Sequence, residues 1–242
     1  MSESPFDALA AMYEEFSELP FRQQLEFPSV LALVGPPQGL RILDLGCGSG
    51  VYCRYLAANG ADTVTGLDRS AGMIDYARRR EGHECFGIRY LQDDLPPALA
   101  GTFDLVLSVY VLPYATTYDE LLALCRTAAD ALRPGGRFLT LPIHPDPDHY
   151  TRYGFRMYQE SSREDGAPVG LDLRFGSHDA HLTARYWSAP TLERALTEAG
   201  FQQHRWHAHR TSRHAAGDPF YQPYLDAPHA AIVETVRGAE QR

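Results

Sequence analysis

Apolar residues follow two different periods along the chain, and their alternation predicts an α/β protein. Compact apolar runs such as residues 41–45 are typical of buried parallel strands. Between them, apolar residues at helical spacing predict helices, for example over residues 118–132. This rhythm specifies a mostly parallel sheet with helices on both faces. The expected strands are residues 41–45, 63–68, 86–91, 103–109, 137–143, 201–207 and 230–236, and the expected helices between them are residues 52–58, 70–80, 118–132 and 191–199.

Two segments depart from this rhythm. Residues 1–38 carry apolar positions at helical spacing that are interrupted at Pro20, which predicts two short helices and a lid before the first strand. Residues 144–189 are rich in Pro, Tyr and Arg and contain an alternating stretch at 179–187. We interpret them as a strand-bearing insertion that reaches over the carboxyl edge of the sheet toward the substrate. The length of 242 residues suits one domain, residues 1–242.

Composition narrows the class of partner. A net charge of −9 argues against a nucleic-acid partner, because such proteins usually present a basic stripe. All 22 basic residues are arginine, which excludes a Schiff-base lysine. The four cysteines form no CxxC pair, so we expect neither a metal site nor disulfides, and a reducing cytoplasm suits them. No apolar run approaches the roughly 18 residues of a membrane span and no signal peptide is evident, so we expect no membrane association.

The loop after the first expected strand contains Gly46, Gly48 and Gly50. Open parallel sheets bind ligands at the carboxyl ends of strands, where the strand order reverses. Glycine allows the backbone to approach a ligand closely, and the following helix offers free N–H groups. A glycine loop of this kind is weak evidence alone, so its neighbours decide what it binds.

Acidic residues at the ends of three successive strands decide the ligand. Asp44 precedes the loop, where a carboxylate would repel a pyrophosphate but attract a cation. Asp68 ends the second strand, placed to accept hydrogen bonds from both ribose hydroxyls, and Asp93 or Asp94 follows the third, near an adenine amino group. A cationic adenosine ligand is S-adenosylmethionine (SAM). An NAD-dependent dehydrogenase is disfavoured by Asp44 and by the absence of GxGxxG spacing.

These motifs, with residues 103–106 and 132–136, resemble those of class I SAM-dependent methyltransferases over about residues 40–143. The resemblance implies a Rossmann-like seven-stranded sheet whose last strand is antiparallel. It also implies that Asp44 and the glycines contact the methionine part of SAM, Asp68 the ribose, and Asp94 with Leu95 the adenine. The expected cofactor contacts are Tyr13, Arg22, Asp44, Gly46, Cys47, Gly48, Asp68, Arg69, Met73, Asp94, Leu95 and Ser108.

Within that set, Tyr13 and Arg22 are expected to close over the sulfonium and the carboxylate respectively, although helix packing and a surface charge are equally open interpretations. A narrower resemblance is to the toxoflavin-synthase-like group, which methylates small nitrogen heterocycles. Pro142 and His144 depart from that group's pattern, which puts the substrate in doubt. The resemblance rests on residues 12–16, 109–115, 152–154 and 186–188.

Methyl transfer needs a nucleophile held close to the methyl group, and a general base only where the nucleophile loses a proton. The expected catalytic residues are His144, Tyr114 and Tyr110, because they follow the fourth and fifth strands. His144 is the candidate base, with a loop histidine bonded to a carbonyl as the alternative. Other candidates are His149, Tyr150, Tyr153 and Tyr186.

Several alternatives remain open from the sequence. A SAM-consuming cyclase that makes azetidine-2-carboxylate and methylthioadenosine would show the same motifs, and so would a non-catalytic SAM-binding module. The expected substrate is a small molecule, since no separate recognition domain is evident, and a role in specialised metabolism follows from the resemblance alone. The sequence does not predict the oligomeric state. An aromatic set could form a substrate wall or plain core, namely Trp187, Trp206, Phe220, Tyr221 and Tyr224.

Overall fold

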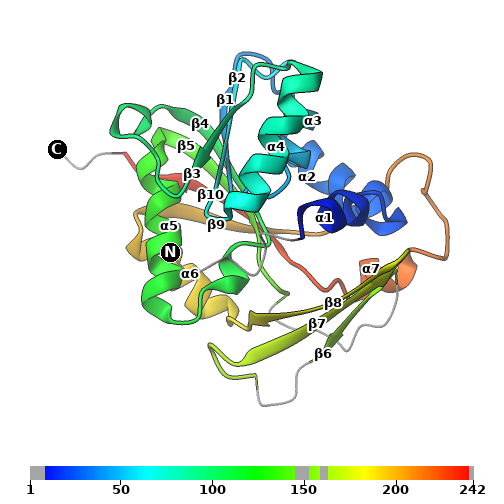
Figure 1. The fold of residues 1–242 in the computed structure, drawn as a ribbon. Coiled ribbons are helices and arrows are strands. Elements are labelled where there is room, and N and C mark those ends of the chain that lie inside the picture. Colours follow the sequence, from blue (N-terminus) through cyan, green and yellow to red (C-terminus); the bar gives the residue numbers. More distant parts are fainter. Residues whose placement is uncertain (1–8, 145–152, 159–162, 240–242) are drawn as a thin grey trace.

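The computed structural model describes residues 9–144, 153–158 and 163–239 (Figure 1). Its centre is a seven-stranded sheet in the order β3-β2-β1-β4-β5-β10-β9, which confirms the predicted Rossmann-like class. The strand β10 is antiparallel to both of its neighbours, as the resemblance implies. The strands are β1 (Arg41–Leu45), β2 (Thr63–Asp68), β3 (Arg89–Gln92), β4 (Phe103–Val109), β5 (Leu132–Leu141), β9 (Phe201–His207) and β10 (Ile232–Arg237).

Helices cover both faces of this sheet, because successive strand residues point to opposite faces and each face is apolar. On one face, Leu43 and Val106 pack against α5 and α6. On the other, Ile42 and Leu105 pack against α2, α3 and α4. The helices are α1 (Ala10–Ser17), α2 (Phe27–Val34), α3 (Val51–Ala58), α4 (Ala71–Glu84), α5 (Tyr118–Ala131), α6 (Ala189–Glu198) and α7 (Gln222–Asp226), with short 3-10 turns η2 (Pro97–Leu99) and η3 (Leu112–Tyr114).

The insertion forms a second sheet, as expected from its alternating pattern. Strands β6 (Phe155–Tyr158), β7 (Pro168–Phe175) and β8 (His178–Arg185) pair antiparallel in sequence order. This small sheet lies apart from the central one, near α1 and α7 (Figure 1), and β8 contacts η3. A third apolar cluster joins it to α1 and to the segment before β10. The candidates His149 and Tyr150 lie outside the described residues.

Three local differences from the sequence prediction have physical causes. The second N-terminal helix opens with a π-helical turn, η1 (Arg22–Glu26), which runs directly into α2. Residues 133–136, which lie between an expected helix and an expected strand, form an irregularity inside β5, because the pairing register with β4 shifts there. The strand β3 begins later than expected, at Arg89, because α4 continues to Glu84 and the positive φ angles of Cys85 and Gly87 keep the connecting residues out of an extended conformation.

The order of the strands in the sheet identifies where a ligand would bind. From β1 the chain builds outward through β2 and β3, then returns to the other side of β1 with β4. The switch point therefore lies between β1 and β4, where ligands of such sheets bind. No helix within the described ranges is both long and apolar enough to span a bilayer.

Candidate functional site

The glycine loop after β1 is held to the second strand by its backbone. The N–H groups of Gly46 and Cys47 both donate to the carbonyl oxygen of Leu67, at 2.7 and 3.1 Å. Gly46 has φ of +75°, and a Cβ atom there would overlap Cγ2 of Val111. The loop and the segment after β4 thus approach so closely that only glycine fits. This narrow contact forms one wall of a cavity.

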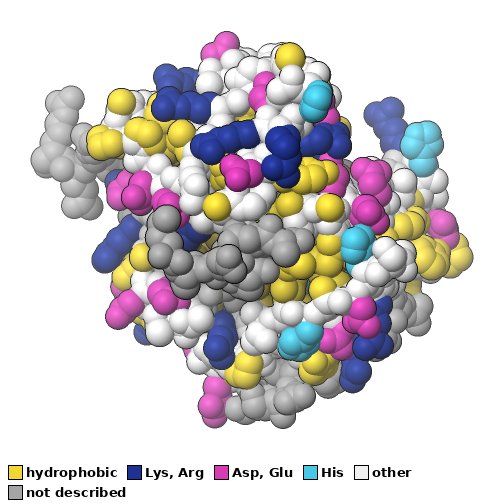
Figure 2. Space-filling model, in the orientation of Figure 1, with side chains coloured by type: hydrophobic (Ala, Val, Ile, Leu, Met, Phe, Trp, Pro, Cys, Tyr) yellow, Lys and Arg dark blue, Asp and Glu magenta, His cyan; other side chains and the backbone are white. Residues whose placement is uncertain are grey.

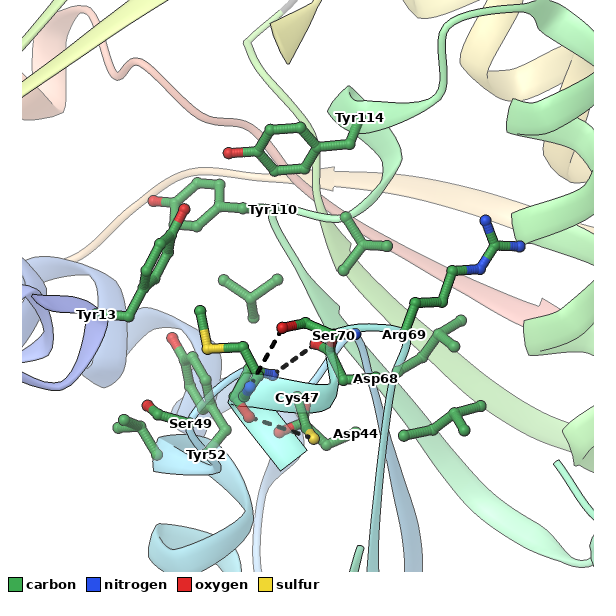
Figure 3. A pocket seen from close by; sticks show the side chains of 18 of the residues that line it. Tyr13, Asp44, Cys47, Ser49, Tyr52, Asp68, Arg69, Ser70, Tyr110 and Tyr114 are labelled. Atoms are coloured by element: carbon green, nitrogen blue, oxygen red, sulfur yellow. Dashed lines mark hydrogen bonds between the residues drawn. The ribbon is translucent and has the colours of Figure 1, made fainter. Parts of the chain in front are cut away.

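Asp68 ties the loop to the start of α4 (Figure 3). Its Oδ2 accepts a hydrogen bond from Gly48 N and its Oδ1 one from Ser70 N, both at 2.8 Å. Ser70 in turn caps α4 by accepting from Met73 N. The carboxylate therefore stands at the carboxyl end of β2 on the cavity wall, where the sequence predicts a ribose-binding acid.

Asp44 is a buried carboxylate beneath the loop, with 2% of its surface exposed. It accepts a hydrogen bond from the Cys53 thiol at 3.2 Å. Burial raises the pKa of Asp44 to about 7, and the Cys53 hydrogen bond offsets this only in part. A cation placed beside a carboxyl group with such a pKa would stabilise its ionised form.

The main cavity has a volume of about 360 Å³ and runs along the carboxyl ends of β1, β2 and β4. In Figure 3, the phenols of Tyr13, Tyr110 and Tyr114 lie together across the cavity from the loop residues. The phenols of Tyr13 and Tyr114 are hydrogen-bond partners. Of the expected residues, the cavity brings together Tyr13, Arg22, Asp44, Gly46, Cys47, Gly48, Asp68, Arg69, Met73, Asp94, Leu95, Tyr110 and Tyr114.

A second, smaller cavity of about 50 Å³ shares the three tyrosines with the main one. The insertion sheet and the turn η3 form its other walls. Hydrophobic side chains gather between α1 and this sheet on the face shown in Figure 2. The described lining residues are Tyr13, Phe16, Tyr110, Pro113, Tyr114, Ile143, Phe155, Leu171, Leu173, Leu182, Ala184 and His229, so that none of them carries a fixed charge.

Beneath the tyrosines lies a buried carboxylate, Glu26, in the π-helical turn; it is 0% exposed. Its Oε1 lies 2.8 Å from Arg22 Nε and accepts a hydrogen bond of 2.9 Å from the Tyr52 hydroxyl. Its Oε2 accepts a hydrogen bond from the Tyr110 hydroxyl. The guanidinium carbon of Arg22 also lies 5.5 Å from the Tyr110 ring centroid. The buried charges are therefore paired, and Arg22 still lines the main cavity.

Two expected residues do not line either cavity. Ser108 is fully buried inside β4, opposite Thr140 of β5, and its neighbours Val109 and Tyr110 reach the cavity instead. His144 follows β5 as predicted, but it lines neither cavity. Its backbone N donates to the carbonyl oxygen of His229 at 2.9 Å, and His229 is the described histidine that lines the smaller cavity.

The sequence interpretation also missed several residues at the site. The helix α5 contributes Leu124 and Thr127 to the wall of the main cavity. The one signal available for Glu26 was an acid inside the apolar stretch Leu25 to Phe27. The aromatic residues that could have walled a substrate pack in the core or at the surface: Trp187, Trp206, Phe220, Tyr221 and Tyr224.

The residues present suit SAM. The cavity lining follows the strand order β3-β2-β1: Asp93 and Asp94 with Leu95 come after β3 and suit an adenine ring, and Asp68 ends the next strand, β2. Asp44 of β1 and Arg22 also line the cavity, a carboxylate and a guanidinium for the charged methionine part. In its ionised form, Asp44 would repel a pyrophosphate placed beside it.

Comparisons with known proteins agree with this assignment. Residues 42–136 match the family described as a methyltransferase domain. The ubiquinone biosynthesis O-methyltransferase of Acinetobacter baylyi is 26% identical over 216 residues, which cover 78% of this chain and 89% of that protein. The N-demethylindolmycin N-methyltransferase of Streptomyces griseus is 29% identical over 166 residues, or 67% and 69% of the two chains.

Among solved structures, an SAM-dependent methyltransferase from Mesorhizobium loti is similar with a TM-score of 0.63 and 26% identity. The match covers 88% of this chain and 97% of that one. The matched methyltransferase domain and these likenesses support a class I SAM-dependent methyltransferase; the protein is an enzyme, and its cofactor is S-adenosylmethionine. Both relatives named above act on small molecules.

The pKa of Asp44 predicts that SAM binding depends on pH. With a pKa of about 7, Asp44 is mostly protonated at pH 6 and mostly ionised at pH 8. Only the ionised form attracts the cationic cofactor, so the dissociation constant should fall about tenfold from pH 6 to pH 8. Isothermal titration calorimetry measures this directly. Asp44→Asn should bind weakly with no such slope, whereas Asp75→Asn, on the exposed face of α4, should keep it.

The same shift predicts how the cofactor-free enzyme responds to pH. The folded-state pKa lies above the ordinary value of 3.8. The contribution of Asp44 to the free energy of unfolding is therefore present below about pH 4 and is lost as pH rises through 7. Bound SAM should restore it above pH 7. Calorimetry at several pH values measures the free energy of unfolding. If it changed with pH equally in wild type and in Asp44→Asn, this assignment would be contradicted.

Proposed function

We propose that this enzyme transfers the methyl group of SAM to a small, uncharged acceptor that carries an N–H or O–H group. The main observation in support is the apolar cavity that shares Tyr13, Tyr110 and Tyr114 with the cofactor cavity. A molecule in the smaller cavity would face the methionine end of the larger one across these rings. The expected contacts of Asp44, Asp68 and Asp94 with SAM, and a cytoplasmic location suited to four free cysteines, are parts of the same proposal.

The protein's contribution to such a reaction is mainly positional. When bound, SAM supplies a methyl group already activated by the sulfonium charge. The loop residues and Asp68 would hold one partner, while the aromatic rings and the insertion sheet would hold the other. Fixing two reactants in line is worth up to roughly 7–11 kcal/mol of the barrier. The apolar walls also exclude water from the reacting atoms.

The lining of the smaller cavity supports an uncharged acceptor. No described lining residue carries a fixed charge, and burial holds the pKa of His229 well below its usual range. A carboxylate or phosphate placed there would lose its hydration without gaining a partner. A neutral aromatic or heteroaromatic ring meets flat rings and aliphatic side chains instead. The N-methyltransferase relative from Streptomyces griseus supports a nitrogen acceptor, and with it a role in specialised metabolism.

The volume supports a small acceptor. A cavity of about 150 Å³ is known to hold benzene, while this one has about 50 Å³. An acceptor ring would therefore extend from it into the shared space beside the three tyrosines. The same small volume favours a second candidate, intramolecular cyclisation of SAM to azetidine-2-carboxylate with loss of methylthioadenosine, since that reaction needs no acceptor.

Product analysis separates the candidates. The purified enzyme is incubated with SAM alone and with SAM plus small phenols, indoles or pyrazoles, and the adenosine product is identified by mass spectrometry against an enzyme-free control. S-adenosylhomocysteine that forms only with an acceptor supports methyl transfer. Methylthioadenosine from SAM alone overturns it in favour of cyclisation. Tight SAM binding without any turnover would support a non-catalytic module.

A matched pair of variants tests the acceptor cavity in the same assay. Ala184→Leu adds bulk to the cavity wall, so acceptor turnover should fall about tenfold or more while SAM affinity stays unchanged. Thr183→Leu adds similar bulk at the neighbouring position of β8, where the side chain is exposed, and should behave like wild type. Equal turnover in both variants would place the acceptor elsewhere.

A further inference from the structure

One arginine, Arg54 of α3, joins three separate parts of the chain. It is buried, with 8% of its surface exposed. Its Nη1 donates to the carbonyl oxygen of Ser49 at 2.7 Å, and its Nη2 donates to Oε1 of Glu14. Its Nε lies 3.4 Å from Oε2 of Glu84. A planar guanidinium with five donors can hold several acceptors in fixed directions. Arg54 therefore links α1, the glycine loop and the end of α4.

Two of these three partners belong to segments that form the main cavity. Ser49 itself lines that cavity, and Tyr13, which precedes Glu14 in α1, lines both cavities. In Figure 3, Tyr13 reaches into the cavity from α1, while Ser49 lies in the glycine loop. Neither Arg54 nor Glu14 is among the described residues that line a cavity. The two charged side chains can therefore act on a ligand only through their neighbours.

The helix α1 depends on tertiary contacts for its place. It has eight residues, which is too short for a stable helix in water without such contacts. Its N-cap residue is Leu9, whose side chain cannot accept a hydrogen bond from the first N–H groups. Met12 and Phe16 hold one side of the helix to the third apolar cluster. Glu14, two positions after Met12 and so on the opposite side of the helix, supplies a polar link to Arg54.

The charges around Arg54 are balanced. Glu14 and Glu84 bring two carboxylates, and Arg80 of α4 brings the second cation. Arg80 pairs with Glu84, and its Nη1 lies 3.9 Å from Oε1 of Glu14. The side chain of Arg80 is 42% exposed, whereas that of Arg54 is 9% exposed. Salt screens a buried pair much less than an exposed one. The pair of Arg54 with Glu14 is therefore the main polar link of α1 to α3.

We propose that Arg54 and Glu14 are positioning residues for cofactor binding: their ion pair fixes the helix that carries Tyr13 against the glycine loop. The proposal rests on the place proposed above for SAM, the main cavity, and it holds for methyl transfer and for cyclisation alike. With the pair intact, the two walls are ordered before SAM binds, so no interaction energy goes into ordering them. Without it, α1 keeps only its apolar contacts, and the distance of Tyr13 from the loop is no longer fixed. Bound SAM should then dissociate faster.

The test compares two substitutions of similar size at the partners of Arg54. Glu14→Gln should raise the dissociation constant for SAM about tenfold, mostly through faster release. Glu84→Gln removes a carboxylate from the same guanidinium, but at the opposite end of α4 from Met73, which lines the cavity. Each variant should lower the melting temperature by roughly 2–4 °C, yet Glu84→Gln should bind SAM within about twofold of wild type. Isothermal titration calorimetry gives the dissociation constants, and a chase of radiolabelled SAM gives the release rates.

Two further variants separate the ion pair from a general loss of stability. Glu14→Asp keeps a carboxylate and should bind SAM within about threefold of wild type. In an Arg54→Met background, Glu14→Gln should cause no further loss of SAM affinity, because the pair is already broken. The proposal is overturned if Glu14→Gln binds SAM as the wild type does, or if Glu14→Gln and Glu84→Gln weaken SAM binding equally.

Asp44→Asn distinguishes that failure from a wrong place for SAM. If SAM bound elsewhere, Asp44→Asn and Glu14→Gln would both bind it like the wild type. A weakened Asp44→Asn beside an unchanged Glu14→Gln overturns the ion-pair proposal alone. Methylthioadenosine formed from SAM alone would overturn methyl transfer and leave the expected affinities as they stand.

Discussion

Gly46→Ala should weaken SAM binding about 100-fold while leaving the protein folded. The added Cβ atom would overlap Val111, so the loop must move away from the segment after β4. Overpacking of this kind costs roughly 1–3 kcal/mol, and the left-handed φ adds to it. A change of about 1.4 kcal/mol is tenfold in affinity. Isothermal titration calorimetry with SAM gives the dissociation constant, and circular dichroism confirms the fold.

Gly39→Ala separates steric overlap from backbone strain. Gly39 has φ of +73°, close to that of Gly46, but a Cβ atom there would meet nothing within 4 Å. This variant should lose some stability and bind SAM as wild type does. If Gly46→Ala binds SAM within about threefold of wild type, the close approach of loop and wall is not what shapes the cofactor cavity.

Glu26→Gln should destabilise the protein by about 3–5 kcal/mol, because it leaves the buried Arg22 guanidinium without its counter-charge. For a chain of this size, that loss lowers the melting temperature by roughly 6–20 °C. Urea unfolding monitored by fluorescence measures the change in free energy, and a thermal scan measures the shift in Tm.

The double variant Arg22→Met with Glu26→Leu tests the same explanation. Removing both charges and filling the space with apolar side chains of similar size should recover most of the lost stability. It should still bind SAM less tightly, because Arg22 lines the main cavity. A double variant as unstable as Glu26→Gln would show that the hydrogen bonds of Tyr52 and Tyr110, rather than the unpaired charge, account for the loss.

The cofactor half of the site is largely readable from the sequence. Asp44, Gly46, Asp68 and Asp94 each stand at the carboxyl end of a strand or just beyond it. In a parallel sheet these ends meet at one edge, so position along the chain translates directly into position in space. All four residues line the same cavity. Ser108 was the exception, because it lies one residue too early and remains inside β4.

The acceptor half is not readable in this way. His144 was the natural candidate because it follows β5, yet His229 occupies the cavity wall. The antiparallel return of the chain before β10 brings Ala230 opposite Ile143, and His229 arrives beside that point. Glu26 is likewise placed by the π-helical turn, and no periodicity in the sequence predicts such a turn.

The sequence by itself thus determined the mostly parallel sheet with helices on both faces and the residues expected to hold SAM, since repeating local patterns and strand ends carry that information. The tertiary structure decided the size and lining of the smaller cavity, the contacts of Glu26 with Tyr52 and Tyr110, and the contact of Tyr110 with His229. These depend on how residues 26, 84 and 119 positions apart pack around one another. Packing of that kind is set by the shape of the whole fold and leaves no local trace in the chain.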